Sequence, residues 1–334
     1  MVGCRAHVIV LSTPADAHAE LIGTRLRNRF AAEVTVWDTS GVPARQTLSI
    51  ASHRDTYLLG SVGPVPFDLG SATSCWWRRP MASSIPDEVG EPRVRQYCRL
   101  ESDRLTRGAL LAARIPLVND PVRQSAADHK PLQLRIAREV GLRIPDTLIT
   151  NDPDAALRFV DSLSGRCIFK AFHSPSWRIV ETREFNESMK ADLGALRFAP
   201  VVLQEYVPLG RDIRVIAMKH AVFAATVSRR SPEAYLDWRL DTNAKWEPID
   251  LPEGLHGQIV ELIDRLGLCY GSIDLRETPD GEPVFLEINP SGQFLFLEQK
   301  DRHTITDAFC ELLMAGESLS GTSATNAPDP MSPA

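Results

Sequence analysis

The stretch Asp274-Leu-Arg-Glu-Thr-Pro-Asp-Gly-Glu-Pro-Val-Phe-Leu-Glu-Ile-Asn289 decides the fold of this chain. Two runs with strand composition, Tyr270–Glu277 and Pro283–Ile288, lie on either side of the turn signal Pro279-Asp280-Gly281. This order of strand, turn and strand predicts a β-hairpin.

The hairpin is expected to bring oxygen-bearing side chains together. Alternation puts Phe285, Glu287 and Asn289 on one face of the second strand. A loop of four residues would place Asp274 opposite Phe285 and diagonal to Glu287 on that face. Two carboxylates beside an amide oxygen suit Mg²⁺ that holds nucleotide phosphates. A hairpin face with solvated acids is the alternative, and a slip of one residue would move Glu287 to the other face.

Length and composition describe an enzyme-sized chain without membrane or nucleic-acid character. The 334 residues suit two or three subdomains, and the net charge of −6 gives no basic field for nucleic acid. No apolar run is long enough to span a membrane, and the N-terminus lacks a signal sequence. The 6 scattered cysteines, without a CxxC pair, indicate reduced thiols and a cytoplasmic location.

The N-terminal part predicts a small parallel α/β unit. His7–Leu11 and Glu33–Asp38 have strand composition, and Ala17–Phe30 between them has helical spacing. No GxGxxG follows the first strand, so the unit is not predicted to bind a dinucleotide. A first domain boundary is placed after Val118.

Two adjacent tryptophans and two adjacent arginines occur at the end of a predicted strand, in the run Ser74-Cys-Trp-Trp-Arg-Arg-Pro80. We interpret this run as a ligand-recognition element. Arg78 and Arg79 offer planar donors for carboxylate or phosphate, and tryptophan offers a stacking face. A strand with a buried Trp76 and a solvated arginine pair is the alternative.

Two lysines stand out in the middle of the chain. Gln124–Val140 reads as two helical pieces that meet at Lys130-Pro131, because proline is tolerated in a first helical turn. Lys170 lies inside the compact strand Cys167–Ala171, where a lysine is unusual unless paired. A functional interpretation is that the Lys170 ammonium group contacts a phosphate. The alternative is that Lys170 lies at the strand end and extends its ammonium group into solvent.

The later part of the chain adds further polar positions. A strand from Val201 to Val207 ends at a hinge-like Pro-Leu-Gly, and Asp212 and Arg214 share a face of the next strand. A structural ion pair between those two side chains is the alternative to a catalytic Arg214. Ser228–Asn243 is polar and loop-rich.

These features together resemble the ATP-grasp superfamily over roughly Asn119 to Ala315. The resemblance implies an α/β (α+β) ATP-grasp fold preceded by a pre-ATP-grasp domain. The expected domains are residues 1–118, a central subdomain 119–205 with the lid, a C-terminal subdomain 206–316 with the metal site, and a disordered tail 317–334.

The same resemblance implies roles for the polar positions. Arg214 would neutralise phosphate charge during transfer, and Asp274, Glu287 and Asn289 would hold two Mg²⁺ ions. A lid around Ser174–Trp177 would exclude water. The residues expected to bind ATP are Lys130, Lys170, Gln204, Glu205, Tyr206, Val207 and Asp212.

A narrower resemblance is to the graspetide synthetases, ATP-grasp maturases of ribosomal peptides. It rests on Trp-Arg-Arg-Pro, on the run Gly-Leu-x-Ile-Pro-Asp-Thr-Leu-Ile-Thr-Asn151, and on Phe-Leu-Glu-Ile-Asn-Pro-Ser-Gly-Gln-Phe. It implies activation of precursor Asp or Glu side chains as acyl-phosphates and their joining to Ser/Thr hydroxyls or Lys amines. The expected partners are a precursor peptide and a second copy in a homodimer. A small-molecule ATP-grasp ligase and a catalytically dead binding module are the rivals.

Substrate roles follow from that resemblance. Arg78, Arg79, Arg214 and Arg239 are candidates to guide the carboxylate, and Asp237 is the candidate general base. A surface ion pair is the alternative for Asp237 with Arg239.

The leader of the precursor would dock on the central subdomain. Phe185–Leu203, which includes Asp192, is the segment expected to bind it.

Overall fold

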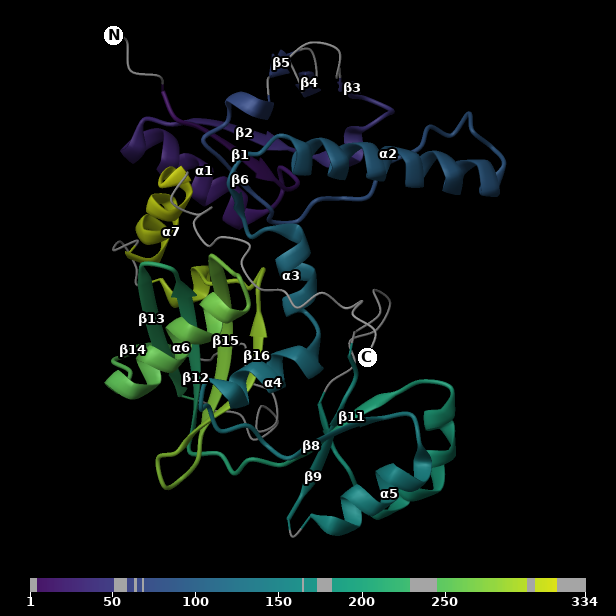
Figure 1. Cartoon of the computed structure of the whole chain (residues 1–334), viewed down its shortest axis with the longest axis vertical. Helices are drawn as coiled ribbons and strands as arrows, with labels where there is room; N and C mark the ends of the chain where they lie inside the picture. Colours follow the sequence, from purple (N-terminus) through teal and green to yellow (C-terminus); the bar gives the residue numbers. More distant parts are fainter. Residues whose placement is uncertain are drawn as a thin grey trace, which may run out of the picture. The chain divides into compact units, whose positions relative to one another are not determined.

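The structure is a computed structural model that describes residues 5–50, 59–62, 65–67, 69–163, 165–172, 182–228, 245–298 and 304–316. The chain forms two compact units. Unit 1 contains residues 1–120 and 306–334, and unit 2 contains residues 121–305. Each unit has its own sheets and its own apolar core (Figure 1).

Unit 1 contains a parallel sheet with the strand order β2-β1-β6-β7. Helix α1 begins after a loop of residues 12–16, and Asp16 caps its first turn by accepting a hydrogen bond from the His18 backbone N–H. A small antiparallel sheet, β3-β4-β5, and two short 3₁₀ helices complete this part. The elements are β1 (His7–Leu11), α1 (Ala17–Phe30), β2 (Glu33–Trp37), η1 (Thr39–Gly41), β3 (Leu48–Ser49), β4 (Leu59–Val62), β5 (Val65–Phe67), η2 (Leu69–Ser71), β6 (Ser74–Trp76), α2 (Pro92–Ala112) and β7 (Leu117–Val118).

The last helix, α7 (Thr304–Met314), packs on unit 1 although it follows unit 2 in the sequence. Phe309 meets the edge of Trp76 with ring centroids 4.8 Å apart. Arg25 of α1 binds Asp307 with Nε and Oδ1 2.5 Å apart, and the Ser74 hydroxyl donates to the Leu313 carbonyl at 2.6 Å. The sequence pattern alone gave no reason to place this helix with unit 1.

The smaller sheet of unit 2 is antiparallel, with the order β10-β9-β11-β8. Its apolar face packs against a helix and a 3₁₀ helix through Ala156, Leu193 and Leu203. The segment Glu187–Arg197 forms this 3₁₀ helix. The elements are β8 (Thr147–Thr150), α5 (Pro153–Ser162), β9 (Cys167–Lys170), β10 (Arg183–Glu184), η3 (Glu187–Arg197) and β11 (Val201–Glu205).

The larger sheet of unit 2 is also antiparallel, with the order β14-β13-β12-β15-β16. Helices α4 and α6 cover one face, where Ile213, Ile273 and Leu275 pack against Ile259 and Leu262 (Figure 1). The elements are α3 (Pro121–Ala127), α4 (Lys130–Glu139), β12 (Arg211–Met218), β13 (Ala221–Ser228), β14 (Lys245–Ile249), α6 (Glu253–Arg265), β15 (Tyr270–Glu277), β16 (Pro283–Asn289) and η6 (Leu295–Leu297). The helix break at Lys130-Pro131 is confirmed.

The hairpin β15–β16 forms, but its predicted register is wrong. Leu275 lies opposite Phe285, whereas Asp274 lies directly opposite Glu287, because the register shifts by one residue between Asp274 and Leu275. This irregularity sends Phe285 into the core beside Ile288 instead of onto the face of Glu287. The predicted proximity of the two carboxylates is nevertheless confirmed, because this shift makes Asp274 and Glu287 cross-strand neighbours.

Candidate functional site

Two crossed ion pairs lie on the face of the large sheet opposite α4 and α6. Strands β12 and β15 each carry the pattern Asp-x-Arg, and their antiparallel register puts Arg214 opposite Asp274 and Asp212 opposite Arg276. Arg214 Nη1 is 2.7 Å from Asp274 Oδ1, and Arg276 Nε is 2.9 Å from Asp212 Oδ1. All four residues are at most 8% exposed. The alternative that Arg214 pairs with Asp212 is therefore wrong.

The two pairs have different neighbours. Arg214 Nη2 donates to the Gln293 carbonyl at 3.4 Å, in the loop that follows β16. Arg276 Nη1 donates to the Val207 carbonyl at 3.5 Å, in the hinge that follows β11. The first pair is thus tied to the exit of the hairpin, and the second pair to the segment that joins the two sheets.

The loop after β16 is held close to Arg214 by a buried tyrosine. The Tyr270 hydroxyl donates to the Gly292 carbonyl at 2.5 Å and lies 3.1 Å from Ser272 Oγ. A Cβ at position 292 would lie 2.3 Å from Ser272 Cβ and 2.9 Å from Arg214 Nη2, so only glycine fits this approach. We call Tyr270, Ser272 and Gly292 the loop latch.

Lys130 lies at the start of α4 and reaches the hairpin. Its Nζ is 2.6 Å from Glu287 Oε2. Gln133, one turn later, donates to the Ile288 carbonyl at 2.9 Å and accepts from the Ile288 N–H at 3.2 Å. This two-way hydrogen bonding fixes α4 along β16 and sets the position of the lysine over the carboxylate.

Lys170 comes from the small sheet and is held by an amide. Its Nζ donates to Gln204 Oε1 at 2.9 Å, and Gln204 in turn donates to the Thr147 hydroxyl at 3.0 Å. Burial lowers the pKa of Lys170 to about 8, the charge on Glu287 opposes this effect, and the charge on Lys130 adds to it. The lysine therefore shares one electrostatic environment with the acids of the large sheet.

The segment predicted to hold adenine, Gln204–Val207, is already well ordered. The Glu205 N–H donates to the Asp146 carbonyl and the Tyr206 N–H to the Arg166 carbonyl, each at 2.8 Å. The Arg166 guanidinium also lies over the Tyr206 ring, 4.1 Å from its centroid. The backbone donors of Glu205 and Tyr206 are thus used inside the fold.

The residues present fit a metal-bound polyphosphate. Asp274 and Glu287 face each other across the strand pair, where Cβ atoms are about 5 Å apart. Lys130, Lys170 and Arg214 supply positive charge around them. Within the described residues, the buried Arg214 Nε has no hydrogen-bond partner, which leaves one donor for a ligand oxygen.

Asn289 lies at the end of β16, opposite Ser272. Its Oδ1 accepts a hydrogen bond from the Ser291 N–H at 2.9 Å. Among the described residues, no group of three or more His, Cys, Asp or Glu side chains is placed to hold a metal ion by itself. The donor set of Asp274, Glu287 and the amide oxygen of Asn289 is the hard-oxygen type that suits Mg²⁺.

The two arginines of the Trp-Arg-Arg-Pro run differ in exposure. Arg78 is buried, its Nε is 3.1 Å from Asp16 Oδ2, and its guanidinium carbon is 5.6 Å from the Trp76 ring centroid. Arg79 is exposed. A peptide can therefore reach Arg79, whereas Arg78 serves the interior of unit 1 in this structure.

Three further predicted positions stand as follows. Asp192 is exposed on η3, next to the buried Leu193. Asp237 and Arg239 lie outside the described residues, and so does the predicted lid around Ser174–Trp177.

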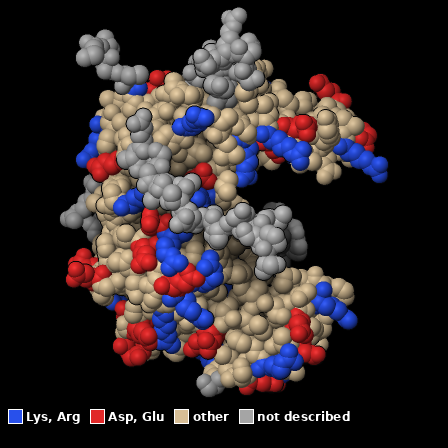
Figure 2. All heavy atoms as spheres, viewed as in Figure 1, with Lys and Arg blue, Asp and Glu red and all other residues tan. Residues whose placement is uncertain are grey.

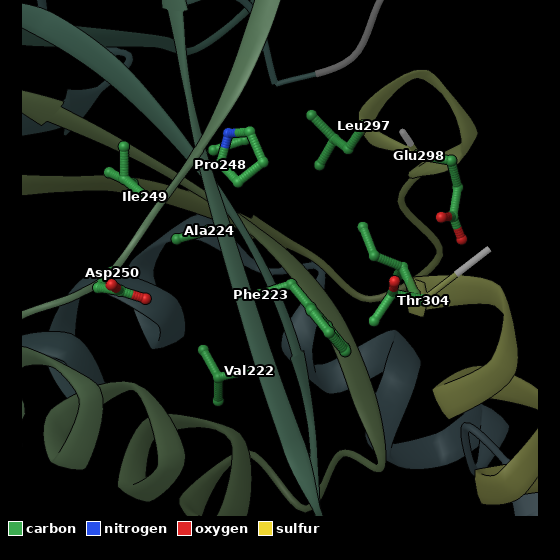
Figure 3. Close-up of a pocket in the computed structure, with 11 residues that line it drawn as sticks. Val222, Phe223, Ala224, Pro248, Ile249, Asp250, Leu297, Glu298 and Thr304 are labelled. Atoms are coloured by element: carbon green, nitrogen blue, oxygen red, sulfur yellow. The ribbon is translucent and has the colours of Figure 1, made fainter. Parts of the chain in front are cut away.

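A pocket of about 280 Å³ lies elsewhere in unit 2, beside β13 and the end of β14 (Figure 3). Phe223, Pro248 and Leu297 contribute apolar surface, and Asp250 and Glu298 contribute carboxylates. None of the predicted site residues lines this pocket.

Solved structures resemble this chain over most of its length. The macrocyclase MdnC from Microcystis aeruginosa MRC, bound with its precursor peptide MdnA, is 26% identical with a TM-score of 0.82, and the match covers 92% of this chain and 99% of MdnC. The ATP-grasp ligase PsnB, complexed with minimal precursor, Mg and ADP, is 26% identical with a TM-score of 0.76, over 92% and 96% of the two chains. This chain is an ATP-grasp ligase related to the graspetide macrocyclases.

A comparison of sequences also finds a relative that is a ligase. The alpha-aminoadipate–LysW ligase LysX of Sulfurisphaera tokodaii is 25% identical over 184 residues, which is 52% of this ligase and 62% of LysX. No family model matches this ligase. No helix in the described residues is long and apolar enough to cross a membrane.

Sequence reasoning missed two parts of the site in this ligase. Arg276 repeats on β15 the Asp-x-Arg pattern that drew attention to Arg214 on β12, so the same alternation would have found it. The loop latch has no such signal, because the contact between Tyr270 and Gly292 depends on how the chain turns after Asn289.

Proposed function

We propose that this ligase is an ATP-dependent peptide macrocyclase. It would activate Asp or Glu side chains of a ribosomal precursor peptide as acyl-phosphates and join them to Ser/Thr hydroxyls or Lys amines. The observation that carries the proposal is the grouping of Lys130, Lys170 and Arg214 around Asp274 and Glu287. MdnC, a relative of similar length, is a macrocyclase bound with a precursor peptide.

ATP would bind between the two sheets of unit 2. Lys130 and Lys170 would contact the phosphates, and Gln204, Glu205, Tyr206 and Val207 would border the adenosine. Since the N–H groups of Glu205 and Tyr206 are used inside the fold, the base edge would be read at Val207. Asp212 would act indirectly, by fixing Arg276 against the Val207 carbonyl.

Asp274, Glu287 and Asn289 would hold Mg²⁺, with two ions as the expected number. Bound Mg²⁺ supplies charge neutralisation and alignment of the phosphates. Asp274 accepts from Arg214 through one oxygen, and a carboxylate has about four acceptor sites, so the same side chain can serve both partners.

The reaction would proceed in two balanced steps. A precursor carboxylate oxygen attacks the γ-phosphorus, the bond to the β-phosphate oxygen breaks, and ADP leaves. A hydroxyl or amine of the same peptide then attacks the acyl carbon, loses its proton to a base and releases phosphate. Arg214 would stabilise the transferring phosphoryl group, because its guanidinium is held by Asp274 and by the Gln293 carbonyl.

The remaining roles concern substrates and assembly. Arg79 and Arg239 would guide the carboxylate, Asp237 would be the base, and the leader would dock along η3 near Asp192. The protein would work in the cytoplasm as a homodimer.

Co-expression with a candidate precursor, a short peptide with a leader and a core rich in Thr/Ser and Asp/Glu, tests the proposal. The peptide should lose the mass of one water for each ring, and Glu287→Gln in the ligase should abolish the loss. An unchanged peptide mass, together with ATP turnover on a free amino acid, would favour a small-molecule carboxylate–amine ligase. No ATP turnover with any acceptor would favour a binding module.

A further inference from the structure

A pocket of about 170 Å³ lies in unit 1, between α2 and the segment that follows β6. Helical spacing puts Asp103, Thr106 and Leu110 on one side of α2, because side chains three and four residues apart are neighbours. Trp77 and residues 80–83 supply most of the remaining wall. None of the residues given a catalytic or substrate role lines this pocket.

Two buried hydroxyl groups in the wall have no hydrogen-bond partner. Ser83 is 2% exposed and Thr106 is 6% exposed, and neither Ser83 Oγ nor Thr106 Oγ1 is bonded to any described residue. By contrast, the Ser102 hydroxyl on the same helix donates to the Cys98 carbonyl at 2.8 Å. Buried hydroxyls normally find a partner, because leaving one unpaired is unfavourable. The two unpaired hydroxyls therefore point to a ligand in the pocket.

Asp103 adds a third acceptor beside the hydroxyls. Its Oδ1 accepts a hydrogen bond from the Ser83 backbone N–H at 2.8 Å, which fixes the carboxylate next to Ser83. Asp103 forms no ion pair within the part of the chain that the structure describes. Arg107, one turn later, lies instead over the Trp77 ring, with its guanidinium carbon 5.8 Å from the ring centroid. The carboxylate thus keeps acceptor sites for a ligand.

The fixed groups of the pocket suit a cation with an apolar stem. The Asp103 carboxylate and the two hydroxyls provide three acceptors, and an ammonium group has three donors. Trp77, Met81 and Leu110 supply apolar surface for the stem, and the Trp77 ring can also face a cation. Arg107 already holds such a position over Trp77, and its long, exposed side chain can move aside.

We propose that this pocket binds the side chain of a lysine; that the lysine belongs to the precursor peptide rests on the proposed function. The volume of about 170 Å³ equals that of about five water molecules, which matches a four-carbon stem with one ammonium group. An ammonium held by a carboxylate keeps its proton and is not a nucleophile. The bound lysine is therefore an anchor that positions the peptide, and a different side chain closes the ring.

The surface along α2 carries both signs of charge. Figure 2 shows blue and red side chains close together along this helix. A mixed surface gives little long-range attraction for either sign. Selection for lysine must then come from the acceptors inside the pocket, so substitutions there are the decisive test.

Titration with short peptides tests the class of ligand. The probes are acetyl-Gly-Lys-Gly-amide and the same peptide with norleucine or glutamate in place of the lysine. The indole N–H signal of Trp77, assigned with Trp77→Phe, reports binding by NMR at up to about 10 mM peptide. We expect the lysine peptide to bind at least about tenfold more tightly than either control. Equal binding of the lysine and norleucine peptides, or no binding of the lysine peptide, would overturn the proposal.

Two charge substitutions distinguish a cation site from an anion site. Asp103→Asn keeps an acceptor for the Ser83 N–H but removes the charge, so it should weaken the lysine peptide about tenfold. Arg107→Gln should strengthen it about two- to fivefold, because the cation that competes for Trp77 is removed. An anion site would give the opposite signs and bind the glutamate peptide best, which would overturn the proposal.

The unpaired hydroxyls give a result that a purely structural role would not. Thr106→Val replaces a hydroxyl without a partner by a methyl group, so the melting temperature should stay unchanged or rise. The same variant should weaken the lysine peptide about fivefold. Ser102→Ala removes a hydroxyl that its own helix satisfies and should leave peptide binding unchanged. Wild-type affinity in Thr106→Val would contradict the proposed ligand set.

A comparison with the free diamine cadaverine identifies the source of the ammonium. The lysine peptide should bind more tightly, because the second ammonium of cadaverine would lie near Arg107. Equal or tighter binding of cadaverine would make a small amine the ligand and overturn the peptide as occupant. These titrations contain no ATP. A ligase that modifies its peptide but binds no lysine probe would refute this pocket alone, whereas lysine binding without peptide modification would refute only the proposed function.

Discussion

The two Asp–Arg pairs on β12 and β15 have the same chemistry but different surroundings. Both are buried, and both span directly opposite positions on neighbouring strands. Arg214 with Asp274 adjoins Glu287 and the loop latch, whereas Arg276 with Asp212 holds the hinge at Val207. We therefore propose that the first pair serves phosphoryl transfer and that the second keeps the two sheets of unit 2 in place.

Removing the aspartate charge from each pair in turn should distinguish the roles of the two pairs. Asp274→Asn and Asp212→Asn should each cost about 3 kcal/mol in unfolding free energy, because each leaves a buried arginine without its anion. Asp274→Asn should also lower ATP turnover by about a thousandfold, whereas Asp212→Asn should stay within about tenfold of wild type. Denaturant unfolding and ATP turnover measure the two effects, and equal losses of turnover would remove the distinction.

The loop latch should be the next most sensitive point. Gly292→Ala places a methyl group against Ser272 and the Arg214 guanidinium, so the loop must shift. We expect turnover to fall about a hundredfold, with about 1–3 kcal/mol lost in stability. Gly281→Ala is a matched glycine substitution at the hairpin turn, where φ is +90° but a Cβ meets nothing within 4 Å. It should cost stability and leave turnover nearly unchanged.

Lys170 should make stability and ATP affinity respond to pH in opposite directions. Its folded pKa of about 8 lies below the ordinary value of 10.5. The unfolded chain therefore holds more protons between these values, so stability rises with pH in this window, by up to about 3 kcal/mol. ATP affinity should fall in the same window, since phosphates need the charged amine. Lys170→Met should remove both slopes, and a variant that keeps the stability slope would show that another group causes it.

Tyr270→Phe should have the smallest effect. It deletes the hydroxyl that donates to the Gly292 carbonyl but keeps the ring. One lost hydrogen bond is worth about 1 kcal/mol, so we expect a fall in turnover of about three- to tenfold at unchanged ATP affinity. A loss of ATP affinity instead would indicate that the tyrosine acts on the nucleotide site.

The secondary structure that carries the site could be predicted from the sequence. The strand register and the contacts between side chains of different elements could not. Turn chemistry and alternation were enough to predict the hairpin and the shared face of Asp274 and Glu287. The bulge that produces this face was not predictable, because it depends on Phe285 filling the core under α4 and α6. Lys130 was found from its helix start, but its contact with Glu287 depends on Gln133 binding β16.

The burial of individual side chains also could not be predicted from the local sequence pattern. Arg78 and Arg79 are adjacent and chemically identical. Arg78 is buried and forms an ion pair with Asp16 at the start of α1, whereas Arg79 is exposed. The partner of Asp212 was misjudged for a similar reason. A neighbour two residues away in the same strand looks close in sequence, whereas the ion pair forms across the strand register.

Metal binding at the hairpin tests the central claim most directly. Mn²⁺ can replace Mg²⁺, and its spin resonance signal reports tight binding in the presence of ADP. Glu287→Gln should weaken Mn²⁺ binding at least about tenfold, because it removes a carboxylate from the ligand set. Asp280→Asn, an acid at the turn of the same hairpin, should leave binding unchanged. Equal Mn²⁺ binding by wild type and Glu287→Gln would show that the hairpin acids serve only as partners of Lys130 and Arg214.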